Sequence, residues 1–421
     1  MTSGAARASG GEGMVLGSAL EAEEAPRGRT AMLALVAVAE LCGMSVWFTA
    51  SAVAEPLRQR WGLEATQAAW LTTAVQLGFV VGTALIALLN VADLVPERAL
   101  VAGSTLGAAA ANAALLLAPG FASAVGTRFL TGMLVAGVYP PAMKMVSTWF
   151  RRGRGLAIGT LVAALTVGKA TPYLVKALEG ASVEAVVLAA SAAATVGAAL
   201  IAIGYRPGPY AFPRRQFSWR LVGALLRQRE TMLAVGGYLG HMWELYAMWA
   251  WVPAFLAASL LARGGAAHPL ADWLAFGAIA SGGAGCIWGG WAADRVGRER
   301  VVQQALVASG LCCLAVGFAF GAPAWTLAAI TWTWGFFVVA DSAQFSALVT
   351  EVAPQDAVGT ALTLQTSMGF LLTMVTLQLV PKLAEIGGWR WAFPVLALGP
   401  AAGIAAIRQL AGTRRGEGIP L

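Results

Sequence analysis

Long apolar stretches constrain this chain more than any other feature, because most of its 421 residues lie in runs long enough to cross a bilayer. A membrane-spanning helix needs about 20 predominantly apolar residues. Only 12% of the residues are charged, whereas soluble domains carry about 25%. The sequence therefore predicts an all-α membrane protein with twelve transmembrane helices. The expected spans are 31–54, 66–90, 98–118, 123–148, 156–178, 183–204, 231–259, 271–292, 301–320, 324–348, 358–382 and 390–408.

Arginines predict the orientation of these spans, because cytoplasmic loops carry an excess of lysine and arginine. An even number of spans places both termini on one side. The loops on that side are rich in arginine, whereas the other loops hold few, chiefly Arg58, Arg60, Arg263 and Arg390. We therefore expect a multi-pass protein of the cell (inner) membrane with both termini in the cytoplasm. The net charge of +7 then reflects topology and not nucleic-acid binding, and we expect a monomer in the lipid bilayer.

The same layout predicts how the chain is divided. Residues 1–28 are rich in Gly, Ala and Glu and are expected to form a disordered cytoplasmic tail. Residues 29–204 and 231–410 are each expected to form a six-helix bundle. Between them, residues 205–230 form a predicted cytoplasmic loop, whose stretch "FSWRLVGALLRQRE" could lie on the membrane surface as an amphipathic helix. Residues 411–421 complete the chain as a second cytoplasmic tail.

Two short segments of the first half reappear in the second half. "ADLVPER" at 92–98 matches "ADRVGRE" at 293–299, and "RGRGLAIG" at 152–159 matches "PQDAVGTALT" at 354–363. Aligning Asp93 with Asp294 needs an offset of 201, and aligning Gly155 with Gly359 needs 204. Two independent pairs with nearly the same offset predict a duplicated six-span unit, and hence two pseudo-symmetric bundles.

One of these segments carries a resemblance to a known family. "GGWAADRVGRER" at 289–300 resembles the G-x-x-x-D-R-x-G-R-[RK] loop of the major facilitator superfamily. Twelve spans, a long central loop and a weaker copy after the second span are similar to that superfamily over nearly the whole chain. The resemblance implies the fold of that superfamily, a secondary transporter, and a loop that latches one face of the structure.

The resemblance also implies which residues form the latch. In the second half they are Asp294, Arg295 and Arg298. In the first half only Asp93 and Arg98 remain, because leucine and proline replace the arginine and glycine of the motif. The first copy is therefore expected to be the weaker latch. The alternative is that both loops serve only as positively charged anchors on the inner face.

Five ionisable residues fall at membrane depth. Glu40 lies in span 31–54, Lys169 in span 156–178, His241 and Glu244 in span 231–259, and Asp341 in span 324–348. A charge near the bilayer centre costs roughly 2.5–3.5 kcal/mol on insertion scales, so it usually faces a cavity or a partner, often in a proton relay. We therefore predict that Glu40, His241, Glu244 and Asp341 carry protons.

Each of these residues has a structural alternative. His241 and Glu244 are three residues apart and share one helical face, where they can exchange a proton. They could equally join neighbouring helices. Lys169 could form an ion pair with Glu40, and Asp341 could be a latch at the inner end of its span.

The predicted substrate site combines a cation with aromatic and polar side chains. Lys169 would neutralise an anion, assisted by Arg128 unless that side chain snorkels toward the surface. By resemblance, spans one, four, seven and ten line a central cavity, to which spans five and eleven contribute. Most of the tryptophans are expected in interfacial belts. The predicted substrate-binding residues are Lys169, Arg128, Trp47, Tyr173, Met248 and Gln365.

The sequence does not predict an enzyme. No segment matches a P-loop, a Cys/His nucleophile arrangement or a dinucleotide-binding glycine loop, so no cofactor is expected and an ion gradient must supply the energy. A copper site at His241, Met242 and Met248 is disfavoured because Met242 lies off the face that the other two share. No metal site is therefore predicted.

Three functions remain open. The favoured one is proton-coupled uptake of a small organic or inorganic anion. Nitrate itself is disfavoured, because the nitrate branch of the resembling superfamily has a buried arginine in spans two and eight, and this chain has neither. The first alternative is proton-antiport efflux of a cationic or amphipathic compound, with Glu40, Glu244 and Asp341 in an aromatic cavity. The second is a membrane sensor that has lost transport.

Overall fold

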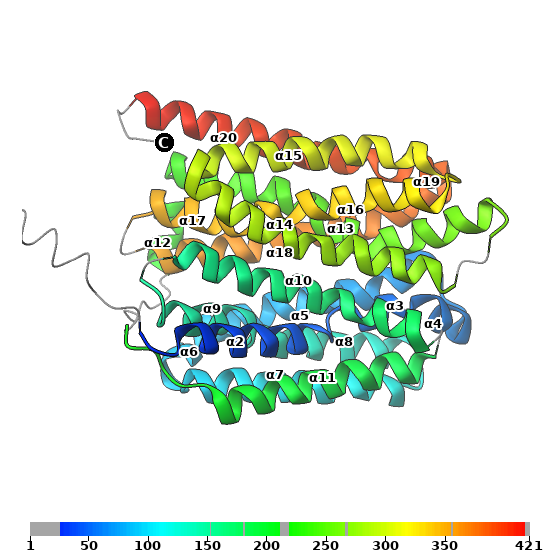
Figure 1. The fold of residues 1–421 in the computed structure, drawn as a ribbon, viewed down its shortest axis with the longest axis horizontal. Coiled ribbons are helices and arrows are strands. Elements are labelled where there is room, and N and C mark those ends of the chain that lie inside the picture. Colours follow the sequence, from blue (N-terminus) through cyan, green and yellow to red (C-terminus); the bar gives the residue numbers. More distant parts are fainter. Residues whose placement is uncertain are drawn as a thin grey trace, which may run out of the picture.

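The computed structural model describes residues 26–151, 153–179, 182–210, 219–265, 268–354 and 357–416, and in these ranges every regular element is a helix. Most of the helices run along the long axis of the molecule (Figure 1). Both ends of the described chain lie at the left of that view, on what we call the terminal face. The short helices α4 (Ala54–Trp61) and α19 (Trp389–Ala392) lie at the opposite face.

We refer to residues 26–210 as the N-terminal half and to residues 219–416 as the C-terminal half. The other helices of the N-terminal half are α2 (Arg29–Met44), α3 (Thr49–Ala52), α5 (Ala65–Leu88), α6 (Val91–Leu94), α7 (Glu97–Ala113), α8 (Phe121–Val135), α9 (Tyr139–Ser147), α10 (Arg154–Glu179) and α11 (Val183–Gly204). Those of the C-terminal half are α12 (Trp219–Leu225), α13 (Arg229–Ala262), α14 (Leu270–Val296), α15 (Arg298–Ala315), α16 (Ala324–Ala340), α17 (Ser342–Val352), α18 (Val358–Gly387) and α20 (Leu398–Gly416).

Ten helices among the described residues are long and apolar enough to cross a membrane, and one of them, Phe121–Ser147, comprises α8 and α9 together. The chain is thus an all-helical, multi-pass membrane protein. The two other expected spans are interrupted: residues 31–54 are split into α2 and α3, and residues 324–348 into α16 and α17. The expected count of twelve therefore stays a prediction, in which these two broken helices supply the missing crossings.

The break between α2 and α3 is stabilised by contacts from other helices. Carbonyl groups at a helix end need partners when they are buried away from water. The Arg128 guanidinium, on α8, donates to the carbonyl oxygens of Val46 and Trp47 at 2.9 and 2.5 Å. Ser45 Oγ donates to the Ala190 carbonyl oxygen at 3.0 Å. The chain can therefore leave the helix at membrane depth and present Trp47 to the interior.

A further break, between α8 and α9, corresponds in position to the break between α16 and α17, as expected for a duplicated unit. α8 and α9 are separated at residues 136–138, and α16 and α17 are separated at Asp341. Gly137 and Asp341 differ by 204 positions, the same offset as between Gly155 and Gly359. Corresponding helices of the two halves are thus interrupted at corresponding places.

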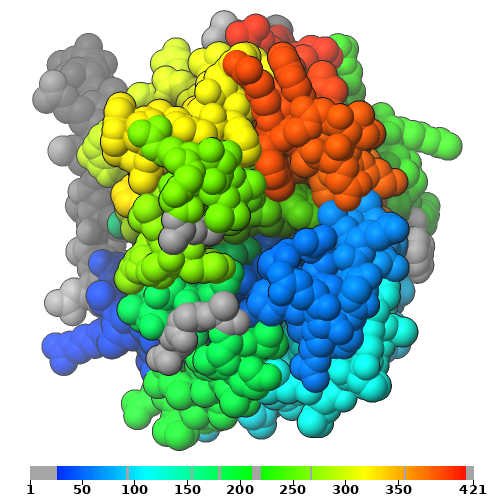
Figure 2. All heavy atoms as spheres, turned by 90° about the vertical axis from the view of Figure 1, so that its right-hand side faces the viewer, coloured from blue at the N-terminus to red at the C-terminus, as the bar shows by residue number. Residues whose placement is uncertain are grey.

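The two halves meet along two seams. In the first, α10 packs against α14 through small residues: a Cβ added to Gly159 would lie 3.3 Å from the Cys286 carbonyl oxygen. In the second, α5 packs against α18, where Gln378 Nε2 donates to Thr73 Oγ1 at 3.0 Å. Figure 2 views the opposite face, with segments of the N-terminal half in blue, cyan and green below and those of the C-terminal half in yellow and orange above. The candidate site lies in the interior, between these seams.

The helices at the predicted tails and central loop do not all begin and end at the predicted boundaries. α20 continues to Gly416, beyond the expected end of the last bundle at 410. α12 falls within the predicted amphipathic stretch of the central loop, and α13 already begins at Arg229. Residues 1–25 of the predicted N-terminal tail lie outside the described ranges.

Candidate functional site

The centre of the site is a buried lysine that touches both halves. Lys169, on α10, is 2% exposed, and its Nζ donates to the Tyr246 hydroxyl of α13 at 2.5 Å. The same Nζ lies 4.1, 4.7 and 5.1 Å from the ring centroids of Trp47, Tyr246 and Trp249. Gly168 allows α10 to lie close to α2, because an added Cβ there would collide with the Leu41 carbonyl oxygen of α2. Lys169 is therefore held by cation–π contacts and one hydroxyl.

Aromatic rings from both halves surround this lysine. The Trp47 ring lies 5.2 Å from Phe79 of α5, 5.7 Å from Tyr246 and 5.8 Å from Phe370 of α18. Phe79 and Phe370 are closer still, with centroids 4.5 Å apart. We call this set the central aromatic cluster; its members are Trp47, Phe48, Phe79, Tyr246, Trp249 and Phe370. The rings fill the junction, so the site is closed in this structure.

Glu40 is a second buried ionisable residue, and it lies within electrostatic reach of Lys169. It lies on α2, is 2% exposed, and neither carboxyl oxygen has a hydrogen-bond partner. It interacts electrostatically with Lys169, but no ion pair within 4.0 Å joins the two in the described part of the chain. The alternative considered for Lys169, an ion pair with Glu40, is therefore not formed in this structure. A buried carboxyl group without partners is costly. A bound ligand or a proton would lower this cost for Glu40.

Other buried polar groups in the site also lack partners. The indole nitrogens of Trp47 and Trp249 have none, nor do the Tyr173 hydroxyl and the Gln365 carbonyl oxygen. Native proteins leave few such groups, and each needs an explanation. Met248, another predicted site residue, is fully buried on α13.

Arg128 has a different role from the one expected. It is completely buried and does not snorkel. Its guanidinium donates to Asn112 Oδ1 at 2.8 Å, in addition to the Val46 and Trp47 carbonyl oxygens. Two of its nitrogens donate to protein acceptors, so Arg128 holds the chain at Trp47, while its Nε has no hydrogen-bond partner.

His241 pairs with Asp341. The His241 Nδ1 lies 2.8 Å from Asp341 Oδ1, and its Nε2 lies 2.9 Å from Ser342 Oγ. Both ring nitrogens of His241 are thus engaged, and they join α13 to the break between α16 and α17. The expected sharing of a proton with Glu244 is replaced by this pairing.

Glu244 also has its own partners, all within the C-terminal half. Its carboxylate accepts hydrogen bonds from Ser309 Oγ at 2.9 Å, from Cys313 Sγ at 3.2 Å and from the Trp334 indole nitrogen. These donors lie on α15 and α16, away from the central aromatic cluster. The face of α13 that carries Glu244 therefore points into its own half, contrary to the expectation that it lines the cavity.

Two residues of α13 that meet the N-terminal half are absent from the predicted substrate-binding residues. They are Tyr246 and Trp249, whose rings lie 6.2 and 6.1 Å from that of Phe48. The charged residue predicted on this helix, Glu244, lies on a different face. An amphipathic aromatic residue beside a predicted cavity would have been the better signal, because its ring packs while its polar tip binds.

The predicted latch residues separate into three groups. The Asp294 carboxylate oxygens would lie 3.8 and 4.0 Å from a Cβ on Gly155, so Asp294 meets the first turn of α10 in the other half. A helix N-terminus favours an anion. Arg298 instead pairs within its own half, with Glu351 at 2.8 Å, and Arg295 stacks on the ring of Trp291. In the first copy Arg98 is exposed, and the side chain of Asp93 lies outside the described part.

A second contact between the halves lies near the opposite face. Lys176 Nζ, on α10, is 3.2 Å from Asp272 Oδ1 of α14, and both side chains are less than 10% exposed. The other oxygen of Asp272 lies 2.5 Å from His268 Nδ1. The seam between α10 and α14 is thus held by charges at both ends, with Asp294 at the terminal face and Asp272 at the opposite face.

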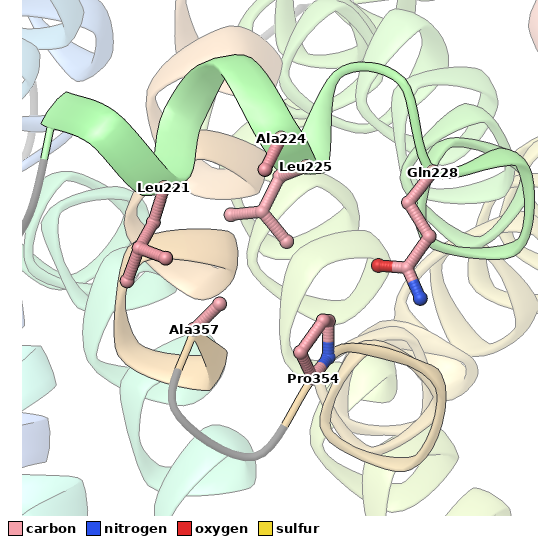
Figure 3. A pocket seen from close by; sticks show the side chains of 6 residues that line it. All are labelled: Leu221, Ala224, Leu225, Gln228, Pro354 and Ala357. Carbon is pink, nitrogen blue, oxygen red and sulfur yellow. The ribbon is translucent and has the colours of Figure 1, made fainter.

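Two surface grooves lie away from this site. One, of about 330 Å³, is lined by α12 and the residues around Pro354 at the terminal face (Figure 3). Its lining is mostly apolar, and Gln228 Nε2 donates to the Val352 carbonyl oxygen beside it. The other, of about 390 Å³, runs between α5 and α18 and includes Trp70 and Lys382. Neither groove contains Lys169 or Glu40.

Long apolar helices around a buried, partly unsatisfied polar site are the features of a multi-pass membrane transporter. The sequence model of the Major Facilitator Superfamily matches residues 35–262, which is more than half of the chain and reaches the last residue of α13. No curated protein matches the chain. The chain therefore belongs to the Major Facilitator Superfamily, whose members are membrane transporters and not, in general, enzymes.

Proposed function

We propose that this transporter takes up a small organic or inorganic anion together with protons, by alternating access. The observation that carries the proposal is Lys169: a buried ammonium group at the junction of the halves, with aromatic rings and a hydroxyl for neighbours and no carboxylate at ion-pair distance among the described residues. An unpaired charge in a low-dielectric interior is unfavourable. A substrate anion would supply the missing charge, so binding is favourable at this position.

Glu40 is the proposed proton carrier. Its carboxyl oxygens have no hydrogen-bond partner, and it interacts electrostatically with Lys169. A proton on Glu40 removes a negative charge that would otherwise repel the anion, so protonation and anion binding support each other. Glu244 is held by three donors, and His241 and Asp341 hold each other. These three residues are therefore the less favoured carriers, and we assign them to the cohesion of the C-terminal half.

Alternating access requires the seams between the halves to open one end at a time. The Lys176–Asp272 pair would close the opposite face, and Asp294 at the first turn of α10 would close the terminal face. The two contacts lie on the same pair of helices, α10 and α14. Rocking of one half against the other would therefore break one contact while keeping the other.

The proposed arrangement in the cell has twelve spans in two six-helix bundles, and the protein works as a monomer in the cell (inner) membrane. The arginine bias supports a cytoplasmic terminal face. Cysteines introduced at the exposed residues Arg220 and Glu385 test this orientation. An impermeant maleimide added to intact cells should label Glu385→Cys above the background of the unmodified chain and leave Arg220→Cys unlabelled; labelling of Arg220→Cys reverses the topology.

Efflux of a cationic or amphipathic compound by proton antiport is the second candidate. The observation in its favour is that the unpartnered carboxyl group of Glu40 interacts with Lys169, which the aromatic cluster surrounds; a carboxylate and aromatic rings together can bind an organic cation. In that case Lys169 would repel the substrate, and removing its charge would strengthen binding. The sign of the Lys169 effect thus separates the two candidates.

Proteoliposomes loaded with a pH-sensitive dye test the proposed function. Sodium salts of organic and inorganic anions are added outside, and empty liposomes correct for acid that crosses the lipid unaided. Uptake predicts internal acidification by at least one anion, lost in Glu40→Gln and kept in Glu55→Gln, which changes an exposed carboxylate on α4. Proton movement driven only by added organic cations would contradict the proposal and support efflux.

A further inference from the structure

We infer that the substrate is a monocarboxylate with an apolar, aromatic or branched body, held between Lys169 and the central aromatic cluster. This inference rests on the proposed anion uptake and names the substrate class for the same site. It excludes dianions such as dicarboxylates and phosphate, and it excludes small inorganic anions. Three properties of the site lead to it: one available charge, a matching set of free donors, and an aromatic lining.

The charge of the site favours a single negative charge. Lys169 is the one cation that we find directed at the cluster within the described ranges. The nearest other cations are directed elsewhere: Arg128 donates to Asn112 and to two carbonyl oxygens at the break between α2 and α3, and Lys176 pairs with Asp272. A dianion would therefore keep one uncompensated charge in a dry interior, which is strongly unfavourable.

The free donors match a carboxylate. Trp47 and Trp249 both present an indole N–H that is buried and without a partner, and both rings lie within 5.1 Å of the Lys169 ammonium. The Tyr246 hydroxyl accepts from Lys169 and still has its own proton to donate. A carboxylate has two oxygens and about four acceptor positions. One ammonium group, two indole N–H groups and one hydroxyl would occupy them.

The aromatic lining of the site favours a substrate whose carboxylate is attached to an apolar body. Phe79 and Phe370 lie 4.5 Å apart and close the side of Trp47 that faces α5 and α18. Their rings have no hydrogen-bonding groups to replace the water shell of an inorganic anion. An apolar body displaces these rings and gains burial in exchange, at about 25 cal/mol for each Å² removed from water. The site therefore rewards an organic anion over a hydrated one.

Ligand-induced thermal stabilisation of the purified full-length protein tests the inference. The probes are benzoate, hexanoate, the neutral benzamide, the cation benzylamine, the dianion phthalate, nitrate and phosphate, at one pH and one ionic strength. Benzoate and hexanoate should stabilise the protein, whereas benzamide and benzylamine should not. Phthalate and the inorganic anions should bind at least tenfold more weakly.

Two substitutions assign the binding to this site. Lys169→Gln should abolish stabilisation by benzoate. Trp249→Phe keeps the ring and removes one N–H, so it should weaken benzoate binding roughly tenfold, the usual effect of losing a hydrogen bond to a charged group. Trp325→Phe, at a 74% exposed position on α16, is the matched control and should leave binding unchanged. If Lys169→Gln does not fold, Trp249→Phe carries the test alone.

The possible outcomes separate this inference from the proposal beneath it. Stabilisation by nitrate or phosphate without any by the monocarboxylates overturns the inference and leaves anion uptake standing. Stabilisation by benzylamine alone overturns both. Benzoate binding that is equal in the wild type and in Trp249→Phe overturns the assigned site, and no response to either monocarboxylate overturns the substrate class.

Discussion

The amine of Lys169 and the hydroxyl of Tyr246 are 2.5 Å apart and belong to different halves of the molecule. Lys169 lies on α10 and Tyr246 on α13, so this hydrogen bond ties the halves together at the point where we place the substrate. An anion that binds Lys169 must compete with the hydroxyl or share the amine with it. Substrate binding would therefore alter a contact between the halves directly, which is what coupling of binding to domain motion requires.

Replacing Tyr246 with phenylalanine isolates that contact. Tyr246→Phe keeps the ring in the aromatic cluster and removes the acceptor of a buried ammonium group. A hydrogen bond to a charged group contributes about 1.5–3 kcal/mol, so we expect the free energy of unfolding to fall by that amount. Tyr173→Phe is the matched control, because the buried Tyr173 hydroxyl has no partner and its removal should cost little. Equal effects in thermal or denaturant unfolding would show that the contact contributes nothing.

The relation between Glu40 and Lys169 gives the second prediction. No ion pair joins them, so removing both charges should not restore what removing one destroys. Lys169→Gln should lose substrate binding, and the double variant Glu40→Gln, Lys169→Gln should remain inactive. Binding and transport in liposomes, measured with whichever anion acidifies the wild-type vesicles, provide the test. Recovery of transport in the double variant would mean that Lys169 merely balances Glu40.

Much of the fold could be predicted from the sequence, because a long apolar run in a bilayer has few alternatives to a helix. The breaks were less predictable. The sequence around Val46 does not predict that its carbonyl oxygen accepts a hydrogen bond from Arg128, which is more than 80 positions away. The break at Asp341 became interpretable only when its offset from Gly137 was compared with the offset of the repeated segments.

The sequence indicates which charged residues of the candidate site are buried. It does not indicate which face of each helix points toward the site. Lys169 and Glu40 are candidates from the sequence alone, because an ionisable residue in an apolar run is expensive and rare. For α13 the same rule selected Glu244, whose cost is met by Ser309, Cys313 and Trp334 inside its own half. Which face of a helix points at the cavity depends on its neighbours. A helical spacing pattern alone contains no information about them.

The contact between Glu244 and Trp334 gives the third prediction. If Glu244 stabilises the C-terminal half, then Glu244→Gln and Trp334→Phe should each lower stability, and their effects should not add. Residues in one buried hydrogen-bond network typically show coupling of about 0.5–3 kcal/mol. A double-mutant cycle on unfolding free energies measures this coupling, and Trp251→Phe, two turns further along α13 with an indole that donates to the Leu377 carbonyl oxygen, is the uncoupled control. Additive effects would show that the two side chains act independently.

The fourth prediction concerns the ion pair between Lys176 and Asp272. The two side chains lie on different halves near the opposite face, and each is less than 10% exposed, so the pair is shielded from solvent. Removing one partner of a buried pair leaves an uncompensated charge, which commonly costs 3–5 kcal/mol. Asp272→Asn should therefore favour a state in which the seam is open at this face. A cysteine at Tyr173, one helical turn from Lys176 and 1% exposed in the closed structure, reports the change.

We expect an impermeant maleimide to label Tyr173→Cys slowly in the otherwise unmodified chain and at least several-fold faster when Asp272→Asn is added. Exchanging the charges, with Lys176→Asp and Asp272→Lys together, should slow the labelling again because the pair is restored with the opposite polarity. Glu184→Gln changes an exposed carboxylate in the first turn of α11, whose partner is Ser182, and should leave the rate unchanged. If Asp272→Asn does not accelerate labelling, or if the exchanged pair labels as fast as the single variant, the attraction between Lys176 and Asp272 does not hold this face closed. The packing of small residues between α10 and α14 would then be the barrier.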